Sequence, residues 1–164
     1  MTGKLVPDYV LTDREKKKRE DPHPRVATDM IIEYVQKGQE GLIIITRKYE
    51  PHGLALSGGF LEPDLTCLEN AIKEVEEETH IQMDRSSVKF FDFYDAVKRD
   101  PRKRMVSIVY YGIGTGPYIP DDDADGAHFK THDEIKQMFG RKLFAFDHEQ
   151  IIKDYYRRKD EGRL

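Results

Sequence analysis

The chain has 164 residues, the usual length of one domain, which excludes a large multidomain assembly. Its 27 basic and 31 acidic side chains leave a formal net charge of −4. We therefore expect no nucleic-acid partner, because proteins that bind nucleic acid broadly present a basic surface to the phosphates. Cys67 is the only cysteine, which excludes an intramolecular disulfide and a zinc site made of paired cysteines.

The N-terminal region combines dense charge with few residues to bury. Residues 12–24 interleave basic and acidic side chains, which is typical of a solvated segment rather than a basic targeting signal. We divide the chain into a charged arm at 1–24, one domain at 25–160 and a tail at 161–164. The sequence has neither the apolar run of a signal peptide nor the ~20 apolar residues of a membrane helix. We therefore expect a cytoplasmic protein without membrane contact.

Five segments have the apolar and β-branched composition of strands, at residues 26–35, 42–46, 54–56, 88–97 and 105–113. The first two flank turn residues and predict an antiparallel pair. The last is almost continuously apolar, which favours a strand that is covered on both faces. We therefore expect helices on both sides of the sheet.

Three segments have helical signals, at residues 68–79, near 133–139 and from about 147 to 159. The first contains good helix formers without Gly or Pro, and Asp64, Thr66 or both can cap its start. Strands mixed with a few helices in one domain predict an α/β or α+β fold.

The first predicted helix places three glutamates on one face. At 100° per residue, Glu74, Glu77 and Glu78 lie within one arc. Acids at spacings of three and four residues repel one another in an isolated helix, and a bound cation would reverse that cost. Carboxylate oxygens suit Mg²⁺ or Mn²⁺, which recruit substrate phosphates to complete their coordination. The preceding Gly58-Gly59 pair allows the backbone to approach these acids closely.

The segment from Gly59 to Ile81 resembles the Nudix box, whose pattern is G, five residues, E, seven residues, R-E-U-x-E-E-x-G-U, where U is aliphatic. The spacing matches throughout, and the residues that agree in identity are Gly59, Glu74, Val75, Glu77, Glu78 and Ile81. The departures are Leu65 in place of the first Glu, Lys73 in place of the Arg and His80 in place of the second Gly.

Within the Nudix family the chain is most similar to ADP-ribose pyrophosphatases, over roughly residues 25–158. The short segments that carry this similarity are residues 54–60 (L-A-L-S-G-G-F), 99–102 (R-D-P-R) and 144–148 (F-A-F-D-H). The first has Ser57 where the family has Pro.

The resemblance implies a Nudix-like α/β/α sandwich with a mixed central sheet, a small-molecule nucleotide substrate and a homodimer. It implies that Glu74, Glu77 and Glu78, with the backbone carbonyl of Gly59, hold Mg²⁺ or Mn²⁺ against a diphosphate. The expected reaction is hydrolysis of ADP-ribose to AMP and ribose 5-phosphate, with these glutamates as the catalytic residues. We take Glu74 as the general base.

Arg99 and Arg102 are expected to bind substrate phosphates, because guanidinium groups suit oxyanions. Arg47, at a strand end, is a further candidate, and the structural alternative for these arginines is a solvated turn. Several other residues have no assigned site role: Phe60, Phe91, Phe93 and Tyr94 either stack on adenine or fill the core, Asp122, Asp123 and Asp125 either supply an additional acid or are solvated, and His128, His132 and His148 are taken as structural.

The departures from the box leave two functions open. The missing Glu and Arg are expected to pair in the family and to brace the helix against the preceding loop. Lys73 can instead pair with Glu69 or Glu77 along the helix, which predicts a weakened brace. His80 must adopt the left-handed conformation for which the family uses glycine. The chain is therefore either a metal-dependent hydrolase or a catalytically weak or inactive Nudix-fold module that binds a nucleotide and regulates a partner.

Overall fold

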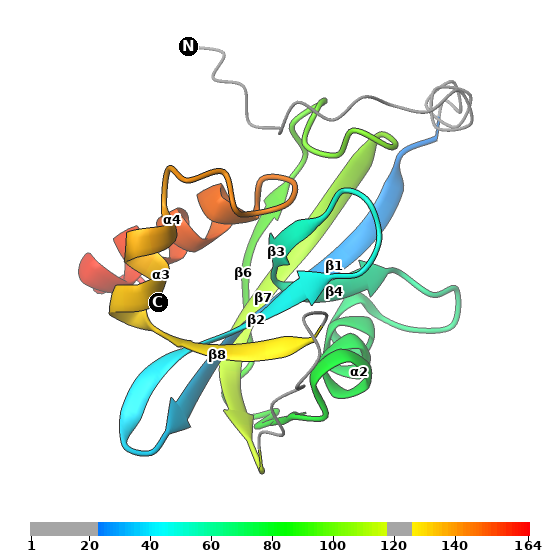
Figure 1. Cartoon of the computed structure of the whole chain (residues 1–164). Helices are drawn as coiled ribbons and strands as arrows, with labels where there is room; N and C mark the ends of the chain where they lie inside the picture. Colours follow the sequence, from blue (N-terminus) through cyan, green and yellow to red (C-terminus); the bar gives the residue numbers. More distant parts are fainter. Residues whose placement is uncertain (1–22, 118–125) are drawn as a thin grey trace.

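The computed structural model describes residues 23–117 and 126–164 (Figure 1). The predicted arm at 1–24 lies almost wholly outside the described residues, as do Asp122, Asp123 and Asp125. The division into arm, domain and tail therefore stays a prediction. Within the described ranges, no helix combines the length and the apolar composition that crossing a membrane requires.

The described residues form one mixed sheet. Its strands are β1 (Arg25–Gln36), β2 (Gln39–Arg47), β3 (Gly53–Ala55), β4 (Ser57–Phe60), β5 (Gln82–Met83), β6 (Lys89–Tyr94), β7 (Met105–Thr115) and β8 (Ala127–Thr131). The order β3-β2-β1-β7-β5 forms the main path, while β4 pairs with β1, β6 with β7 and β8 with β2. The β1–β7 pair is parallel and the other pairs of described strands are antiparallel. The predicted mixed sheet and its first antiparallel pair are confirmed.

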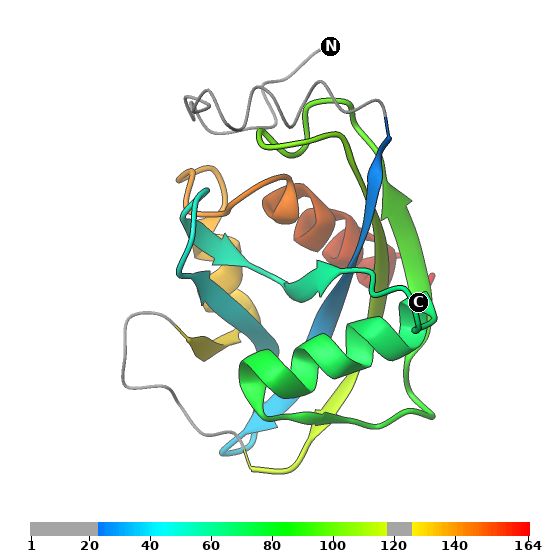
Figure 2. The same ribbon diagram turned by 90° about the vertical axis from the view of Figure 1, so that its right-hand side faces the viewer.

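Helices cover both faces of the sheet. They are α2 (Cys67–Thr79), α3 (His132–Met138) and α4 (His148–Asp160). Figures 1 and 2 show α2 on one face and both α3 and α4 on the other. Because side chains alternate along a strand, Ile31 of β1 joins the core cluster that contains Ile151 of α4, whereas Ile32 joins the cluster that contains Val75 of α2. This alternation confirms the predicted α/β/α sandwich.

Local sequence sets both ends of α2. Thr66 Oγ1 accepts a hydrogen bond from the Glu69 N–H at 3.3 Å, and the Glu69 carboxylate accepts one from the Thr66 N–H at 2.9 Å, which is a capping box. Of the two candidate caps, Thr66 is the one used. The helix ends at His80 with φ 59°. The expected left-handed conformation at the position of the family's glycine is confirmed.

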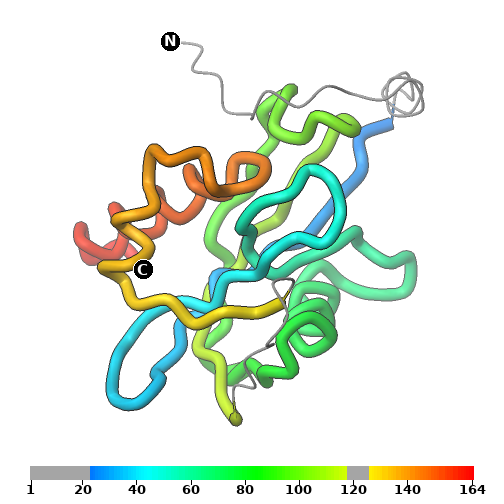
Figure 3. The backbone as a smooth tube through the Cα atoms, viewed as in Figure 1, coloured from blue at the N-terminus to red at the C-terminus, as the bar shows by residue number. Residues whose placement is uncertain are grey.

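Two segments that are distant in sequence lie side by side near the end of β3. The Leu54 N–H donates to the Leu143 carbonyl at 2.9 Å, and the Ala145 N–H donates to the Leu54 carbonyl at 2.8 Å. Both segments can be followed along the tube in Figure 3. Their pairing brings residues 146–148, where α4 begins, close to the loop that leads into β4.

Three of the observed strands are absent from the sequence prediction. β4 contains two glycines, β5 has 2 residues, and β8 lies directly before the predicted short helix. Neither β4 nor β5 shows the alternation that reveals a strand, and β8 alternates only over Ala127 to Lys130. Their strand conformation comes from pairing with β1, β7 and β2, respectively, which is tertiary context rather than local propensity.

Candidate active site

A pocket of about 210 Å³ lies beside the paired strands β1 and β4. Its lining includes Gly59 together with all three predicted arginines, Arg47, Arg99 and Arg102. These residues come from β4, from the end of β2 and from the loop between β6 and β7. The fold therefore gathers the predicted glycine and the predicted phosphate ligands at one place.

The glycines of β4 allow α2 to approach the strand. A Cβ atom added to Gly59 would lie 2.4 Å from Oε1 of Glu74, and one added to Gly58 would lie 2.2 Å from the backbone oxygen of Thr28. Real Cβ atoms essentially never make contacts shorter than 3.0 Å. The absence of a side chain at Gly59 therefore leaves the space that the Glu74 carboxylate fills, as the sequence predicts for the Gly58-Gly59 pair.

The carboxylate of Glu78 is bound by the start of the same strand. It accepts hydrogen bonds from Ser57 Oγ at 2.7 Å and from the Gly58 N–H at 3.0 Å. The residue as a whole is exposed, but desolvation at its carboxylate raises its pKa to about 7, against the two hydrogen bonds, which lower the pKa. Ser57, which stands where the family has Pro, thus supplies a donor to a predicted metal ligand.

Glu74 is half-buried between the helix and the strand. Burial raises its pKa, and the negative charge of Glu77 adds to that rise. The charge of Glu74 in turn raises the pKa of Glu78. The predicted repulsion among these acids is therefore present in the folded protein, and a cation placed between them would relieve it.

Glu77 is turned to a different partner. Lys73 Nζ lies 2.8 Å from the Glu77 carboxylate and 3.0 Å from that of Glu62 in the preceding loop. Glu62 therefore links the loop to the helix, and sequence reasoning missed it as the brace partner. These partly exposed pairs contribute at most about 1 kcal/mol to stability. The Lys73–Glu62 pair therefore joins the same loop and helix as the brace expected in the family, but it stabilises them only weakly.

The oxygen ligands near Gly58-Gly59 are of the type that suits a hard divalent cation. Glu74 and Glu78 both lie against the backbone of Gly58-Gly59, and their oxygens are the ligand type that Mg²⁺ and Mn²⁺ prefer. Within residues 23–117 and 126–164, no three His, Cys, Asp or Glu side chains are grouped closely enough to hold a metal ion. Glu77 would have to leave Lys73 to join the other two glutamates.

The three arginines differ in how far their charges are neutralised. Arg99 is 3% exposed and donates to both oxygens of Asp147, at 2.6 and 2.9 Å. Arg102 is partly exposed and binds both oxygens of Asp100, at 2.8 and 3.1 Å.

Arg47 is the third arginine, and its Nε donates to a backbone oxygen, that of Pro51, at 2.9 Å. Burial, and then the charge of Arg102, lower its pKa. Arg47 and Arg102 are thus the partly exposed cations of the pocket, whereas Arg99 is buried against Asp147.

The floor of the pocket contains an acid and an imidazole that sequence reasoning did not place there. Asp29 of β1 is buried and accepts a short hydrogen bond from Ser107. His148 Nε2 lies 3.8 Å from Asp29, and its Nδ1 accepts the Leu56 N–H at 2.9 Å. Because Nδ1 accepts a hydrogen bond, the ring is neutral, and burial lowers the pKa of His148 to about 3. His148 lines the pocket, whereas the sequence analysis took it as structural.

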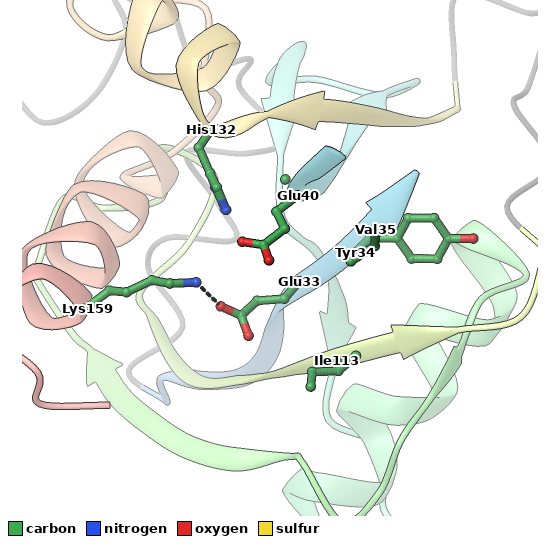
Figure 4. Close-up of a pocket in the computed structure, with 8 residues that line it drawn as sticks. Glu33, Tyr34, Val35, Glu40, Ile113, His132 and Lys159 are labelled. Atoms are coloured by element: carbon green, nitrogen blue, oxygen red, sulfur yellow. Dashed lines mark hydrogen bonds and ion pairs between the residues drawn. The ribbon is translucent and has the colours of Figure 1, made fainter. Parts of the chain in front are cut away.

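A second pocket, of about 170 Å³, contains none of the predicted site residues. Figure 4 shows Glu33, Glu40 and His132 pointing toward one another within it. Lys159 lies 2.6 Å from Glu33, which also accepts a short hydrogen bond from Tyr155. The pocket beside Gly59 is therefore the candidate active site.

A domain family and a curated relative both match most of this chain. The model of the NUDIX domain matches residues 23–155. The ADP-ribose pyrophosphatase of Methanocaldococcus jannaschii is 36% identical over 162 residues, which are 96% of this chain and 89% of that protein.

Solved structures show the same fold. A MutT/nudix family protein from Enterococcus faecalis matches with a TM-score of 0.70 and 26% identity, over 86% of this chain and 64% of that one. This chain thus spans less than two thirds of the Enterococcus protein. The NUDIX domain of Shewanella oneidensis NrtR, solved with ADP ribose, matches with a TM-score of 0.70 and 19% identity, over 90% of this chain and 99% of that one.

The domain model spans most of the described fold, and the Methanocaldococcus relative aligns with almost the whole sequence. On these two findings the chain belongs to the Nudix hydrolase family.

Proposed function

We propose that this protein hydrolyses ADP-ribose to AMP and ribose 5-phosphate with the help of Mg²⁺ or Mn²⁺. The observation that carries the proposal is that Glu74 and Glu78 lie against the same glycine strand that lines the pocket with Arg47 and Arg102. Carboxylates that can hold a cation thus lie against the strand whose glycines share a pocket with guanidinium groups that can hold an anion. The 36% identical relative, an ADP-ribose pyrophosphatase, supports the choice of substrate.

Glu74, Glu77, Glu78 and the Gly59 carbonyl would hold the metal. When bound, a divalent ion polarises the phosphoryl oxygens and lowers the pKa of a water molecule. Glu77 would exchange its ion pair with Lys73 for this role, and Lys73 would keep its pair with Glu62.

The chain's own residues supply orientation and proton transfer. Arg47 and Arg102 bind the phosphate oxygens, while Arg99 is paired with Asp147 and forms part of the pocket wall. Glu74 accepts the proton of the attacking water as the phosphorus–oxygen bond to the leaving phosphate breaks.

Turnover separates this enzyme from a module that only binds the nucleotide. Purified protein is incubated with ADP-ribose and Mg²⁺ or Mn²⁺, and AMP is followed by chromatography. We expect AMP from the wild type, a loss of at least about 100-fold in Glu78→Gln, and wild-type turnover in Glu76→Gln, whose side chain is exposed on the same helix. Binding of ADP-ribose by calorimetry without AMP formation would refute the enzyme and favour the module.

The finer expectations from the resemblance stay predictions. They are the homodimer, the cytoplasmic location and the absence of a nucleic-acid partner. Light scattering of the purified protein measures the first directly, and a shift assay with duplex DNA tests the last.

A further inference from the structure

Phe146 and Asp147, which directly precede α4, together contact all three arginines that line the pocket. Asp147 binds Arg99 through both carboxylate oxygens. The ring centroid of Phe146 lies 4.6 Å from Cζ of Arg47 and 5.0 Å from Cζ of Arg102. His148 packs against the same ring, with the two ring centroids 5.3 Å apart. The ring of Phe146 therefore contacts both of the partly exposed arginines.

The backbone of Phe146 has an unfavourable conformation. Its φ is 55°, in the left-handed region that bulky residues rarely adopt. The neighbouring contacts hold it there, because Ala145 bonds to Leu54 and Asp147 is committed to the buried Arg99. Conformations of this kind persist where the surroundings over-determine them, and they cluster at functional sites.

The two arginines on this ring form an arrangement that favours an anion. Arg102 shares its charge with Asp100, while no ion pair joins Arg47 to a carboxylate within the described part of the chain. The face of an aromatic ring attracts a cation, so Phe146 offsets part of the cost of holding two like charges close together. An anion bound between them would remove the rest of that cost.

We propose that Phe146 is a positioning residue that holds the guanidinium groups of Arg47 and Arg102 ready for the diphosphate of the substrate. The inference rests on the proposed function for the identity of that substrate. Phe146 does not touch the reacting atoms and acts through the two arginines. Fixing two long side chains before binding removes the entropy cost of ordering them during binding.

The first test measures anion binding without turnover. Inorganic pyrophosphate is titrated into the protein in metal-free buffer with a chelator, and KM and kcat for ADP-ribose are measured separately. For Phe146→Leu we expect pyrophosphate affinity to fall about tenfold and KM to rise similarly with little change in kcat, because binding common to ground and transition states is lost. Phe146→Tyr keeps the ring and is expected to restore both values.

A matched control separates this role from a general loss of packing. Phe139 also has a cation over its ring, because Lys153 Nζ lies 5.1 Å from the ring centroid, but Phe139 does not line the pocket. We therefore expect Phe139→Leu to bind pyrophosphate as the wild type does. The proposal is overturned if Phe146→Leu binds pyrophosphate like the wild type, or if Phe146→Tyr binds as weakly as Phe146→Leu. Should the leucine variant fail to fold, Phe146→Met, which keeps most of the volume, takes its place in the same comparison.

A double-mutant cycle tests whether the ring acts through an arginine. In an Arg47→Gln background, Phe146→Leu is expected to weaken pyrophosphate binding by much less than in the wild type. Equal losses in the two backgrounds would refute the positioning role. If ADP-ribose gives no AMP with either metal, the proposed function fails, while the pyrophosphate titrations still decide the role of Phe146.

Discussion

Replacing Gly59 by alanine is expected to remove most turnover while leaving the fold intact. The new Cβ would lie 2.4 Å from Oε1 of Glu74, whereas ordinary van der Waals contact begins at 3.4 Å. The carboxylate must therefore move by about 1 Å, which it can do cheaply because it ends a flexible side chain. A displacement of ~1 Å at a catalytic group costs on the order of 100-fold in rate.

Gly58 provides a contrast, because a side chain there would meet backbone atoms rather than the end of a flexible side chain. A Cβ at Gly58 would lie 2.2 Å from the Thr28 carbonyl oxygen and 2.9 Å from Cα of Asp29. Both atoms belong to the backbone of β1, which is paired on either side and cannot yield. We therefore expect Gly58→Ala to lose about 1–3 kcal/mol of stability through overpacking, a fall of several degrees in Tm.

Two measurements, on the wild type and on both glycine variants, test these expectations. Thermal unfolding is followed by circular dichroism, and AMP release from ADP-ribose is followed with Mg²⁺, for the wild type, Gly59→Ala and Gly58→Ala. Wild-type turnover in Gly59→Ala would show that the Glu74 carboxylate does not need its present position. A Tm as low in Gly59→Ala as in Gly58→Ala would show that Glu74 cannot move aside, contrary to the reasoning above.

Further predictions concern stability. The pKa of His148 is about 3 when folded and 6.5 as the ordinary value, so the unfolded chain binds a proton between these pH values that the folded chain does not. This contribution to stability is present above pH 6.5 and is lost as the pH falls, by about 2 kcal/mol at pH 5. Urea unfolding at pH 7 and pH 5 measures how much unfolding free energy is lost on acidification. We expect that loss to be smaller in His148→Gln than in the wild type. Thr66→Ala removes the capping box of α2 and is expected to cost about 1 kcal/mol in the same assay, and an unchanged midpoint would contradict that role. Lys73→Met and Glu62→Gln should each lower the free energy of unfolding by less than about 1 kcal/mol, and the double variant should lose less than the sum of the two. Additive losses would show that the two side chains do not interact.

Much of the fold could be predicted because local sequence patterns encode it. The apolar run of β1 alternates between two cores, and the capping box of α2 spans 4 consecutive residues, Thr66 to Glu69. β4 and β5 carry no such pattern and β8 only a short one, and the conformation of all three depends on partners elsewhere in the chain.

The candidate site likewise combines features that local sequence predicts with features that only the fold decides. Helical geometry alone predicts that Glu74, Glu77 and Glu78 share one helix face, and the family was indicated by the resemblance of residues 59–81 to the Nudix box. The partner of each charge was decided by the tertiary structure. Arg99 reaches Asp147, 48 residues away in sequence, and is neutralised there.

Local sequence therefore determined which residue types this protein offers for binding a cation and an anion, and on which elements they lie. Only the folded chain decided that Arg47 and Arg102 share the ring of Phe146, and that Glu62 supplies the loop contact of Lys73. The physical reason is range: helix and strand periodicities act over a few residues, whereas these contacts exist only after distant strands have paired and placed their loops together.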